Sequence, residues 1–200
     1  ALYRKLKTSG AISQSSLVVD IGANRGQAAC FFNRLLPESR IIAIEANPDL
    51  IGLLRRKTKQ INIKILPLAL SSKPGILTFY SCVFDEVSTL EPPSMDSKYL
   101  RFKSRVLMTP PEHMYKTVDI KTDTLDRVIS DLRVNSIDIL KIDVEGHEAS
   151  VLLGAESTLS RHIPKFIQLE SHGDDQYAEK GDNAQAILTA HGYRMIAKIK

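Results

Sequence analysis

The sequence predicts an α/β protein built on a doubly wound, mostly parallel sheet. Short, continuous apolar runs alternate along the chain with amphipathic segments of helical period, which is the pattern of repeated β-α units. Such runs are typical of strands that are buried on both faces. Four of the runs end in an acidic residue, namely Asp20, Glu45, Asp143 and Glu170. Because parallel strands joined by right-handed crossovers end at one edge, we expect these carboxylates to share a rim.

The elements can be placed from apolar spacing and from capping residues. The expected strands are apolar or β-branched runs at 16–21, 41–45, within 61–70, 76–80, 118–120, 137–143 and 166–170. The expected helices carry an apolar stripe. Two of them cover residues 1–10 and about 25–36. The others begin after helix-starting residues at Asn47, 122–124, Gly146 and 182–183.

Two segments depart from this alternation. Residues 82–116 contain two Pro-Pro pairs and no clear period, so we expect an inserted loop or lid within a segment around 76–120. Residues 193–199 alternate apolar and basic side chains, which predicts an antiparallel edge strand near the C-terminus.

Composition bounds the class of protein. The chain has 200 residues, 43% of them hydrophobic and 25% charged, which fits one globular domain over residues 1–200, with truncation at one or both ends left open. The net charge of +4 permits an anionic partner without requiring one. The cluster Arg55-Arg56-Lys57 is read as a solvated helix face. Two cysteines make no disulfide framework, so we expect a cytoplasmic protein, and no apolar run approaches the ~20 residues of a membrane span.

The stretch from Asp20 to Gly26 reads as the end of a buried strand, a glycine turn and the start of a helix. A dinucleotide fingerprint would have a middle glycine, and a phosphate-binding P-loop would end in Gly-Lys-Ser/Thr, whereas Gly26 precedes Gln27. A carboxylate at Asp20 would repel a pyrophosphate and would suit a cationic ligand.

The pattern Asp20-x-Gly22-x-Asn24-x-Gly26 resembles motif I of class I S-adenosylmethionine methyltransferases, whose cofactor carries a sulfonium and an ammonium. A second segment, Lys141-Ile-Asp-Val-Glu-Gly-His-Glu148, resembles the FkbM family of methyltransferases, as do Thr124-Leu-Asp126 and Ala69-Leu-Ser-Ser72. The family often has an acid where Ser72 stands. The resemblance covers about residues 16–170, and it implies a Rossmann-like fold.

The resemblance implies that S-adenosylmethionine binds at the glycine turn and the next strand end. Glu45 would accept hydrogen bonds from the ribose diol, or else act as a helix N-terminal acid. Asn24 would either adopt the left-handed turn conformation or orient Asp20. The expected cofactor-binding residues are Asp20, Gly22, Ala23, Asn24, Gly26, Glu45, Ala46 and Ser71.

The residues after the strand at 137–143 are the candidates for catalysis. An alcohol is a weak nucleophile, so a general base would assist methyl transfer, and Asp143, Glu145 and His147 are the candidate groups. Each has a structural alternative, as a helix cap, a helix N-terminal acid and a solvent-exposed side chain respectively. Lys141, inside the strand, is expected to pair with a neighbouring carboxylate.

The resemblance implies an O-methyltransferase that acts on a hydroxyl of a small molecule or sugar. The alternatives are an RNA or protein methyltransferase and a non-catalytic binding or interaction domain of the same fold. We predict no metal site, with Glu170 and His172 beside Asp143 and Glu145 as the one open arrangement for a divalent ion. The identity of the acceptor and the oligomeric state are left open.

Overall fold

The structure, a computed structural model, describes residues 2–82, 88–92, 98–110, 113–170 and 178–198. The strands are β1 (Leu17–Ile21), β2 (Arg40–Glu45), β3 (Ile63–Pro67), β4 (Ala69–Leu70), β5 (Gly75–Cys82), β6 (Tyr115–Asp123), β7 (Ile137–Ile142) and β8 (Pro164–Leu169). The helices are α1 (Leu2–Thr8), α2 (Gln27–Leu35), α3 (Pro48–Lys57), α4 (Lys98–Leu107), α5 (Leu125–Asp131), α6 (Glu148–Leu153), α7 (Glu156–Ser160) and α8 (Ala178–Ala190). Within those described ranges, no helix is long and apolar enough to cross a membrane.

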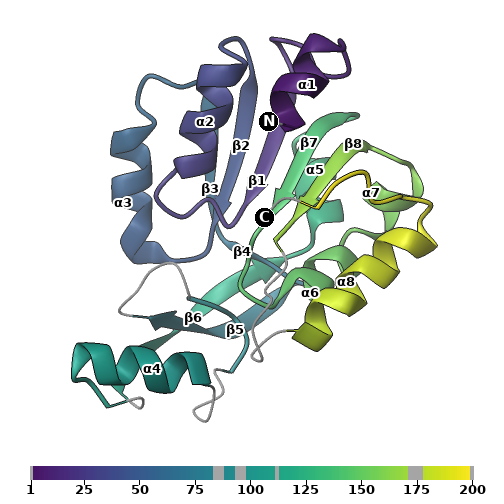
Figure 1. Cartoon of the computed structure of the whole chain (residues 1–200). Helices are drawn as coiled ribbons and strands as arrows, with labels where there is room; N and C mark the ends of the chain where they lie inside the picture. Colours follow the sequence, from purple (N-terminus) through teal and green to yellow (C-terminus); the bar gives the residue numbers. More distant parts are fainter. Residues whose placement is uncertain (1, 83–87, 93–97, 111–112, 171–177, 199–200) are drawn as a thin grey trace.

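The main sheet has five parallel strands in the order β3-β2-β1-β7-β8 (Figure 1). From β1 the chain first builds outward through β2 and β3, and later returns to add β7 on the other side of β1. The order therefore reverses between β1 and β7, and open α/β sheets bind ligands at the carboxyl ends of the strands at such a switch point. The predicted doubly wound, mostly parallel fold is confirmed.

The sheet is buried on both faces, as its continuous apolar strands predict. Neighbouring residues of β1 point to opposite sides, so that Val19 packs with α5, α6, α7 and α8. Val18 packs with α2 and, through partly buried residues, with α1. Residues of α3 pack on the β2 end of the sheet. The two helical layers hold the strand ends in fixed positions, which is what a site at the rim requires.

The inserted segment around 76–120 supplies most of β5 and β6, which join β4 in a small sheet of order β4-β6-β5. This sheet lies with α4 at one end of the molecule (Figure 1). The expectation of a loop or lid over 82–116 missed α4. The buried Leu100 has few buried companions on this helix, while Phe102 is 63% exposed. The apolar residues Phe102 and Val106, at helical spacing, face outward instead of packing on the core.

The expected edge strand at 193–199 is not formed over its described residues, 193–198. Tyr193 is anchored, because its hydroxyl donates to the Pro164 carbonyl at 3.0 Å. Met195 and Ile196 are 63% and 66% exposed, so the alternating pattern buries no apolar face that would favour pairing. The helix before it, α8, begins at Ala178 rather than at the expected cap at 182–183.

The ends of β1 and β7 approach each other closely at Gly22. A Cβ atom added to Gly22 would lie 1.8 Å from the Asp143 carbonyl oxygen, and its φ of +78° is in the left-handed region. The backbone N–H of Asp143 donates to the Ile21 carbonyl at 3.1 Å, so the contact continues the strand ladder. Only glycine fits this junction without moving the backbone.

Two residues before Gly22, the β1–β7 register places Asp20 beside Lys141. The Asp20 side chain is fully buried, and neither of its oxygens has a hydrogen-bond partner. Lys141 Nζ lies 3.5 Å from Asp20 Oδ1 and 2.7 Å from Asp143 Oδ2, so it pairs with neighbouring carboxylates as predicted. Burial raises the pKa of Asp20 to about 6, against the opposing charge of Lys141.

We predict that Gly22→Ala destabilises the fold by about 3 kcal/mol or more, because a Cβ clash adds to left-handed strain. Urea denaturation followed by circular dichroism measures this. Gly52→Ala in α3 is the matched control, since its Cβ meets only the Arg56 guanidinium at 3.6 Å, and it should stabilise slightly. Equal stability of Gly22→Ala and the wild type would contradict the close contact.

We also predict a pH dependence from Asp20. The folded pKa of Asp20, about 6, lies above its unfolded value, so the folded state binds the proton more tightly than the unfolded state does. The stability that this proton contributes is fully present below the unfolded pKa and is lost as pH rises through about 6. Wild-type stability should therefore fall by roughly 1–3 kcal/mol, relative to Asp20→Asn, between about pH 4 and 7. Urea midpoints of both proteins across this range test it, and parallel curves would contradict the assignment.

Candidate active site

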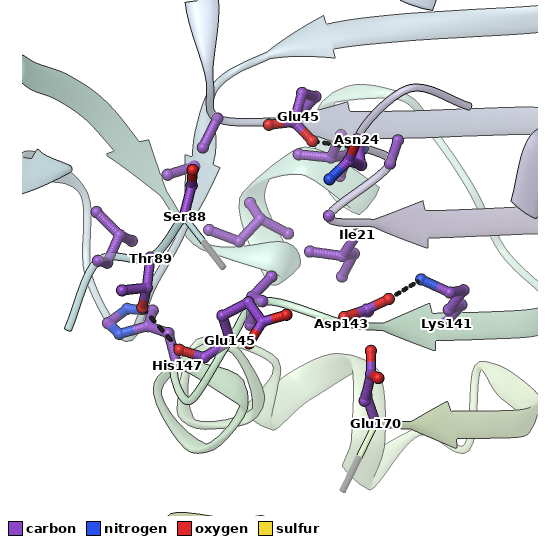
Figure 2. Close-up of a pocket in the computed structure, with 18 of the residues that line it drawn as sticks. Ile21, Asn24, Glu45, Ser88, Thr89, Lys141, Asp143, Glu145, His147 and Glu170 are labelled. Atoms are coloured by element: carbon purple, nitrogen blue, oxygen red, sulfur yellow. Dashed lines mark hydrogen bonds and ion pairs between the residues drawn. The ribbon is translucent and has the colours of Figure 1, made fainter. Parts of the chain in front are cut away.

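A cavity of about 520 Å³ lies at the carboxyl ends of the strands, where β1 and β7 meet (Figure 2). This volume is in the usual range for a small-molecule site. The walls include the glycine turn after β1 and the start of α2, the ends of β2, β4, β7 and β8, residues 88–90 of the insert, and the turn after β7. The lining residues central to the chemistry are Gly22, Ala23, Asn24, Glu45, Ala46, Thr89, Lys141, Asp143, Glu145, His147 and Glu170.

The N–H groups of the glycine turn all have acceptors within the protein. Those of Gly22 and Ala23 donate to the Ile44 carbonyl, and that of Gly26 donates to the Ala23 carbonyl. The Asn24 N–H donates to Glu45 Oε2 at 2.6 Å, and the Arg25 N–H donates to the Asn24 side chain at 2.7 Å. A phosphate-binding turn needs such donors for its ligand. The turn therefore offers no cradle for a pyrophosphate.

Glu45 is held in place by backbone donors from two segments. Its Oε2 accepts from Asn24, and its Oε1 accepts the Asn47 N–H at 2.7 Å. Each carboxylate oxygen can accept a second hydrogen bond, and Glu45 borders the cavity while being 6% exposed. Burial raises the pKa of Glu45, and the N–H groups of Asn47 and Asn24 oppose this. The carboxylate is thus a fixed acceptor pair at the cavity wall.

The turn after β7 is shaped by two residues in left-handed conformations, Glu145 with φ 51° and Gly146 with φ 89°. Glu148 Oε1 accepts the N–H groups of Val144 and Gly146, both at 3.2 Å. Thr89 donates its hydroxyl to the Glu145 carbonyl at 2.7 Å. Non-glycine residues in this region cost energy and cluster at functional sites. In Figure 2 the Glu145 carboxylate points toward Asp143, inside the cavity.

His147 is buried, 6% exposed, rather than pointing to solvent. Its Nδ1 lies 2.6 Å from Glu91 Oε1, and its Nε2 lies 3.0 Å from Ser71 Oγ. With both ring nitrogens bonded, His147 joins the end of β4 to the insert. In this arrangement it shapes the cavity wall and has no nitrogen directed at a ligand.

The described lining is acidic. Its carboxylates come from Glu45, Asp143, Glu145 and Glu170. Among the described lining residues, the one side chain of a lysine or arginine is that of Lys141. Lys141 is engaged by Asp143 and Asp20, whose charges raise its pKa even though burial lowers it. A cationic ligand would relieve the repulsion among these carboxylates. Size, acidity and the occupied turn donors fit S-adenosylmethionine better than a nucleotide phosphate.

Most of the residues that the sequence singled out meet at this cavity. Of the predicted residues, those that line it are Gly22, Ala23, Asn24, Glu45, Ala46, Asp143, Glu145 and His147. Asp20, Gly26 and Ser71 do not line it. Asn24 has the left-handed φ of 49°, which fits the turn role. It gives no hydrogen bond to Asp20, whose oxygens have none.

Sequence reasoning missed the wall that the insert supplies. Ser88 and Thr89 line the cavity, and Glu91 binds His147 behind it. No motif marked these residues, because their role depends on how the insert folds back on the β7 turn. Glu148 was noted only as part of the FkbM-like segment, although an acid two residues after a glycine could have indicated a turn-closing side chain.

The described residues contain no group of three or more side chains suited to hold a metal ion. Glu170 borders the cavity, whereas His172, its partner in the alternative metal arrangement, lies outside the described residues. Cys30 and Cys82 are not joined in a disulfide. The charged side chains in the described part of the cavity lining are therefore the carboxylates and Lys141.

Known proteins resemble this chain in sequence. The 2-O-methyltransferase NoeI of Sinorhizobium fredii is 25% identical over 183 residues, which are 86% of this chain and 69% of NoeI. Methyltransferase 1 of Beauveria bassiana is 30% identical over 152 residues, covering 70% of this chain and 59% of that protein. The hexuronic acid methyltransferase AglP of Haloferax volcanii is 26% identical over 162 residues, covering 80% and 57% respectively. The chain spans less than two thirds of the latter two relatives.

A solved structure shares the fold. The crystal structure of methyltransferase FkbM from Methylobacillus flagellatus superposes with a TM-score of 0.56 at 20% identity, over 89% of this chain and 38% of that one. The sequence profile described as "Methyltransferase FkbM domain" matches residues 20–195, from Asp20 at the end of β1 to the segment after α8. The chain therefore belongs to the FkbM methyltransferase domain family.

Proposed function

We propose that this protein transfers a methyl group from S-adenosylmethionine to a hydroxyl oxygen of a small molecule or sugar. The observation that carries the proposal is the acidic cavity at the β1–β7 switch point, whose glycine turn has its N–H groups already bonded. Membership of a methyltransferase family supports the same reading. A cytoplasmic location stays a prediction from the two cysteines.

The cofactor would be held mainly by the β1 and β2 ends. Glu45 would accept the ribose hydroxyls with the lone pairs that its backbone donors leave over. Ala23, Asn24 and Ala46 line the wall beside it, and Gly22 keeps the turn close to β7. Asp20, Gly26 and Ser71 would support this wall from behind. When bound, the sulfonium supplies an electrophilic methyl group.

The acceptor would occupy the β7 and β8 side of the cavity, between Asp143, Glu145 and Glu170. Holding the acceptor oxygen in line with the donor at ~3–3.5 Å can supply ~7–11 kcal/mol of the barrier. We assign Glu145 the role of general base, which would take the proton from the acceptor hydroxyl. The sulfonium would supply the methyl group, its methyl carbon–sulfur bond breaking as the bond to the acceptor oxygen forms, with S-adenosylhomocysteine as the leaving group. Asp143, fixed by Lys141, would orient the hydroxyl, and His147 would hold the wall.

A polyhydroxylated acceptor fits the polar wall of carboxylates and hydroxyls, which can accept and donate hydrogen bonds. Two relatives are a 2-O-methyltransferase and a hexuronic acid methyltransferase by name, and this supports a sugar as the class of acceptor. An RNA backbone would meet the acidic rim unfavourably. We therefore rank the small molecule above RNA as the acceptor.

Glu45→Gln should weaken binding of S-adenosylhomocysteine by roughly 10- to 100-fold, since a charge-assisted hydrogen bond is worth about 1.5–3 kcal/mol. Isothermal titration calorimetry measures the affinity, with NAD as the comparison ligand. Glu38→Gln, an exposed glutamate before β2, is the control and should bind as the wild type does. Unchanged affinity in Glu45→Gln, or tighter binding of NAD than of S-adenosylhomocysteine, would contradict the cofactor proposal.

Glu145→Gln should lower the rate of methyl transfer by about 10²–10⁴-fold while leaving affinity for S-adenosylhomocysteine within about threefold. The assay follows a labelled methyl group from S-adenosylmethionine into a panel of hexoses and hexuronic acids by mass spectrometry. Asp131→Asn, an exposed acid in α5, is the control. A wild type that binds the cofactor but labels none of the panel would overturn the sugar assignment. A fully active Glu145→Gln would overturn the base.

A further inference from the structure

Helix α4 presents apolar side chains on its outward face. Phe102 and Val106 are four residues apart, so they lie on one side of the helix, and they are 63% and 61% exposed. Leu100 lies on the inward side and is 1% exposed. Figure 1 shows α4 at the end of the molecule opposite α1, beyond β5 and β6. The outward apolar row therefore lies on a protruding part of the structure.

Basic side chains flank this row. Arg101 and Arg105 are also four residues apart and exposed, which places them in the row next to Phe102 and Val106. The ten residues of α4, KYLRFKSRVL, include four basic residues and no acid. An apolar strip beside a cationic strip, on one exposed helix, is the pattern of helices that lie in a bilayer interface.

The residue after the helix adds a further exposed apolar side chain. Met108 has a φ of 53°, a left-handed conformation that glycine usually takes at this position, and its side chain is 91% exposed. The turn is closed by the Thr109 N–H, which donates to the Ser104 carbonyl at 3.1 Å. The backbone thus holds a flexible apolar side chain in solvent at the helix end.

Exposed apolar and basic side chains also lie together on the β5–β6 sheet, where Ile76 is 68% exposed and pairs with Lys121, and on residues 194–198, but neither of these surfaces is a helix. The last turn of α3 carries Arg55, Arg56 and Lys57, but its apolar residues are buried, so it is a solvated face as predicted. Leu153 is 55% exposed on α6 as a single side chain, and Met195 and Ile196 lie on a segment without regular structure. Among the described helices, α4 is the one on which a row of exposed apolar side chains lies beside a row of exposed basic side chains.

We propose that α4 docks this protein on a membrane surface that contains anionic lipids. Arg101 and Arg105 would bind lipid phosphates, for which the guanidinium fork is suited, while Phe102, Val106 and Met108 enter the interface. Charge complementarity selects the anionic bilayer, and the apolar row distinguishes it from a nucleic acid, whose surface offers phosphates without an apolar layer. The attachment is peripheral and does not depend on the methyl acceptor.

Sedimentation with vesicles tests the proposal, using the whole chain with vesicles of phosphatidylcholine alone or mixed with phosphatidylglycerol. The wild type should partition at least about tenfold more onto the anionic vesicles, and raised salt should reduce this. The variants Phe102→Ser/Val106→Ser and Arg101→Glu/Arg105→Glu should each lose most of the binding. These side chains are exposed, so circular dichroism should show both variants folded.

The controls separate the α4 face from general charge and stickiness. Arg55→Glu/Arg56→Glu makes the same charge change on α3, and Leu153→Ser removes an exposed apolar side chain elsewhere, and both should bind as the wild type does. The proposal is overturned by equal binding to the two kinds of vesicle, or by equal loss in the α3 and α4 charge variants. Size-exclusion chromatography that shows a dimer abolished by Phe102→Ser/Val106→Ser would assign the face to a second copy instead.

Discussion

The contact between the ends of β1 and β7 is the constraint on which the site depends. Gly22 lies so close to the Asp143 carbonyl that a side chain there is excluded. The glycine turn after β1 and the acidic turn after β7 are therefore locked together, with one wall of the cavity on each. The same junction brings Asp20, Lys141 and Asp143 into one ion-paired row across the two strands.

This geometry brings several carboxylates together at the carboxyl ends of the strands, around one cavity. Lys141 pairs with two of the carboxylates, Asp20 and Asp143, and backbone N–H groups donate to Glu45. Glu145 and Glu170 line the same cavity. The charge of such a cavity favours cationic ligands over anionic ones, whatever their shape. A phosphate-bearing cofactor would meet repulsion and find no donors in the turn, whereas a sulfonium would be attracted.

The fold and the β1–β2 side of the cavity could be predicted because their signals are local. Continuous apolar runs ending in Asp20, Glu45 and Asp143 gave the sheet and its rim. The helix caps at Asn47 and Thr124 are observed, each accepting an N–H from within its helix. The remaining parts depend on long-range contacts. Thr89 and Glu91 reach the site only through the folded insert, and the pairing of His147 with Ser71 joins residues 76 positions apart. The alternation at 193–198 predicted a strand, but no partner face buries it.

The most direct measurement of the central claim is a crystal structure of the protein with S-adenosylhomocysteine. The account predicts the ligand in the cavity between the glycine turn and the β7 turn, with its ribose hydroxyls on the Glu45 carboxylate and its sulfur facing Asp143 and Glu145. A ligand bound elsewhere, or a ribose that leaves Glu45 to its two backbone donors alone, would contradict it.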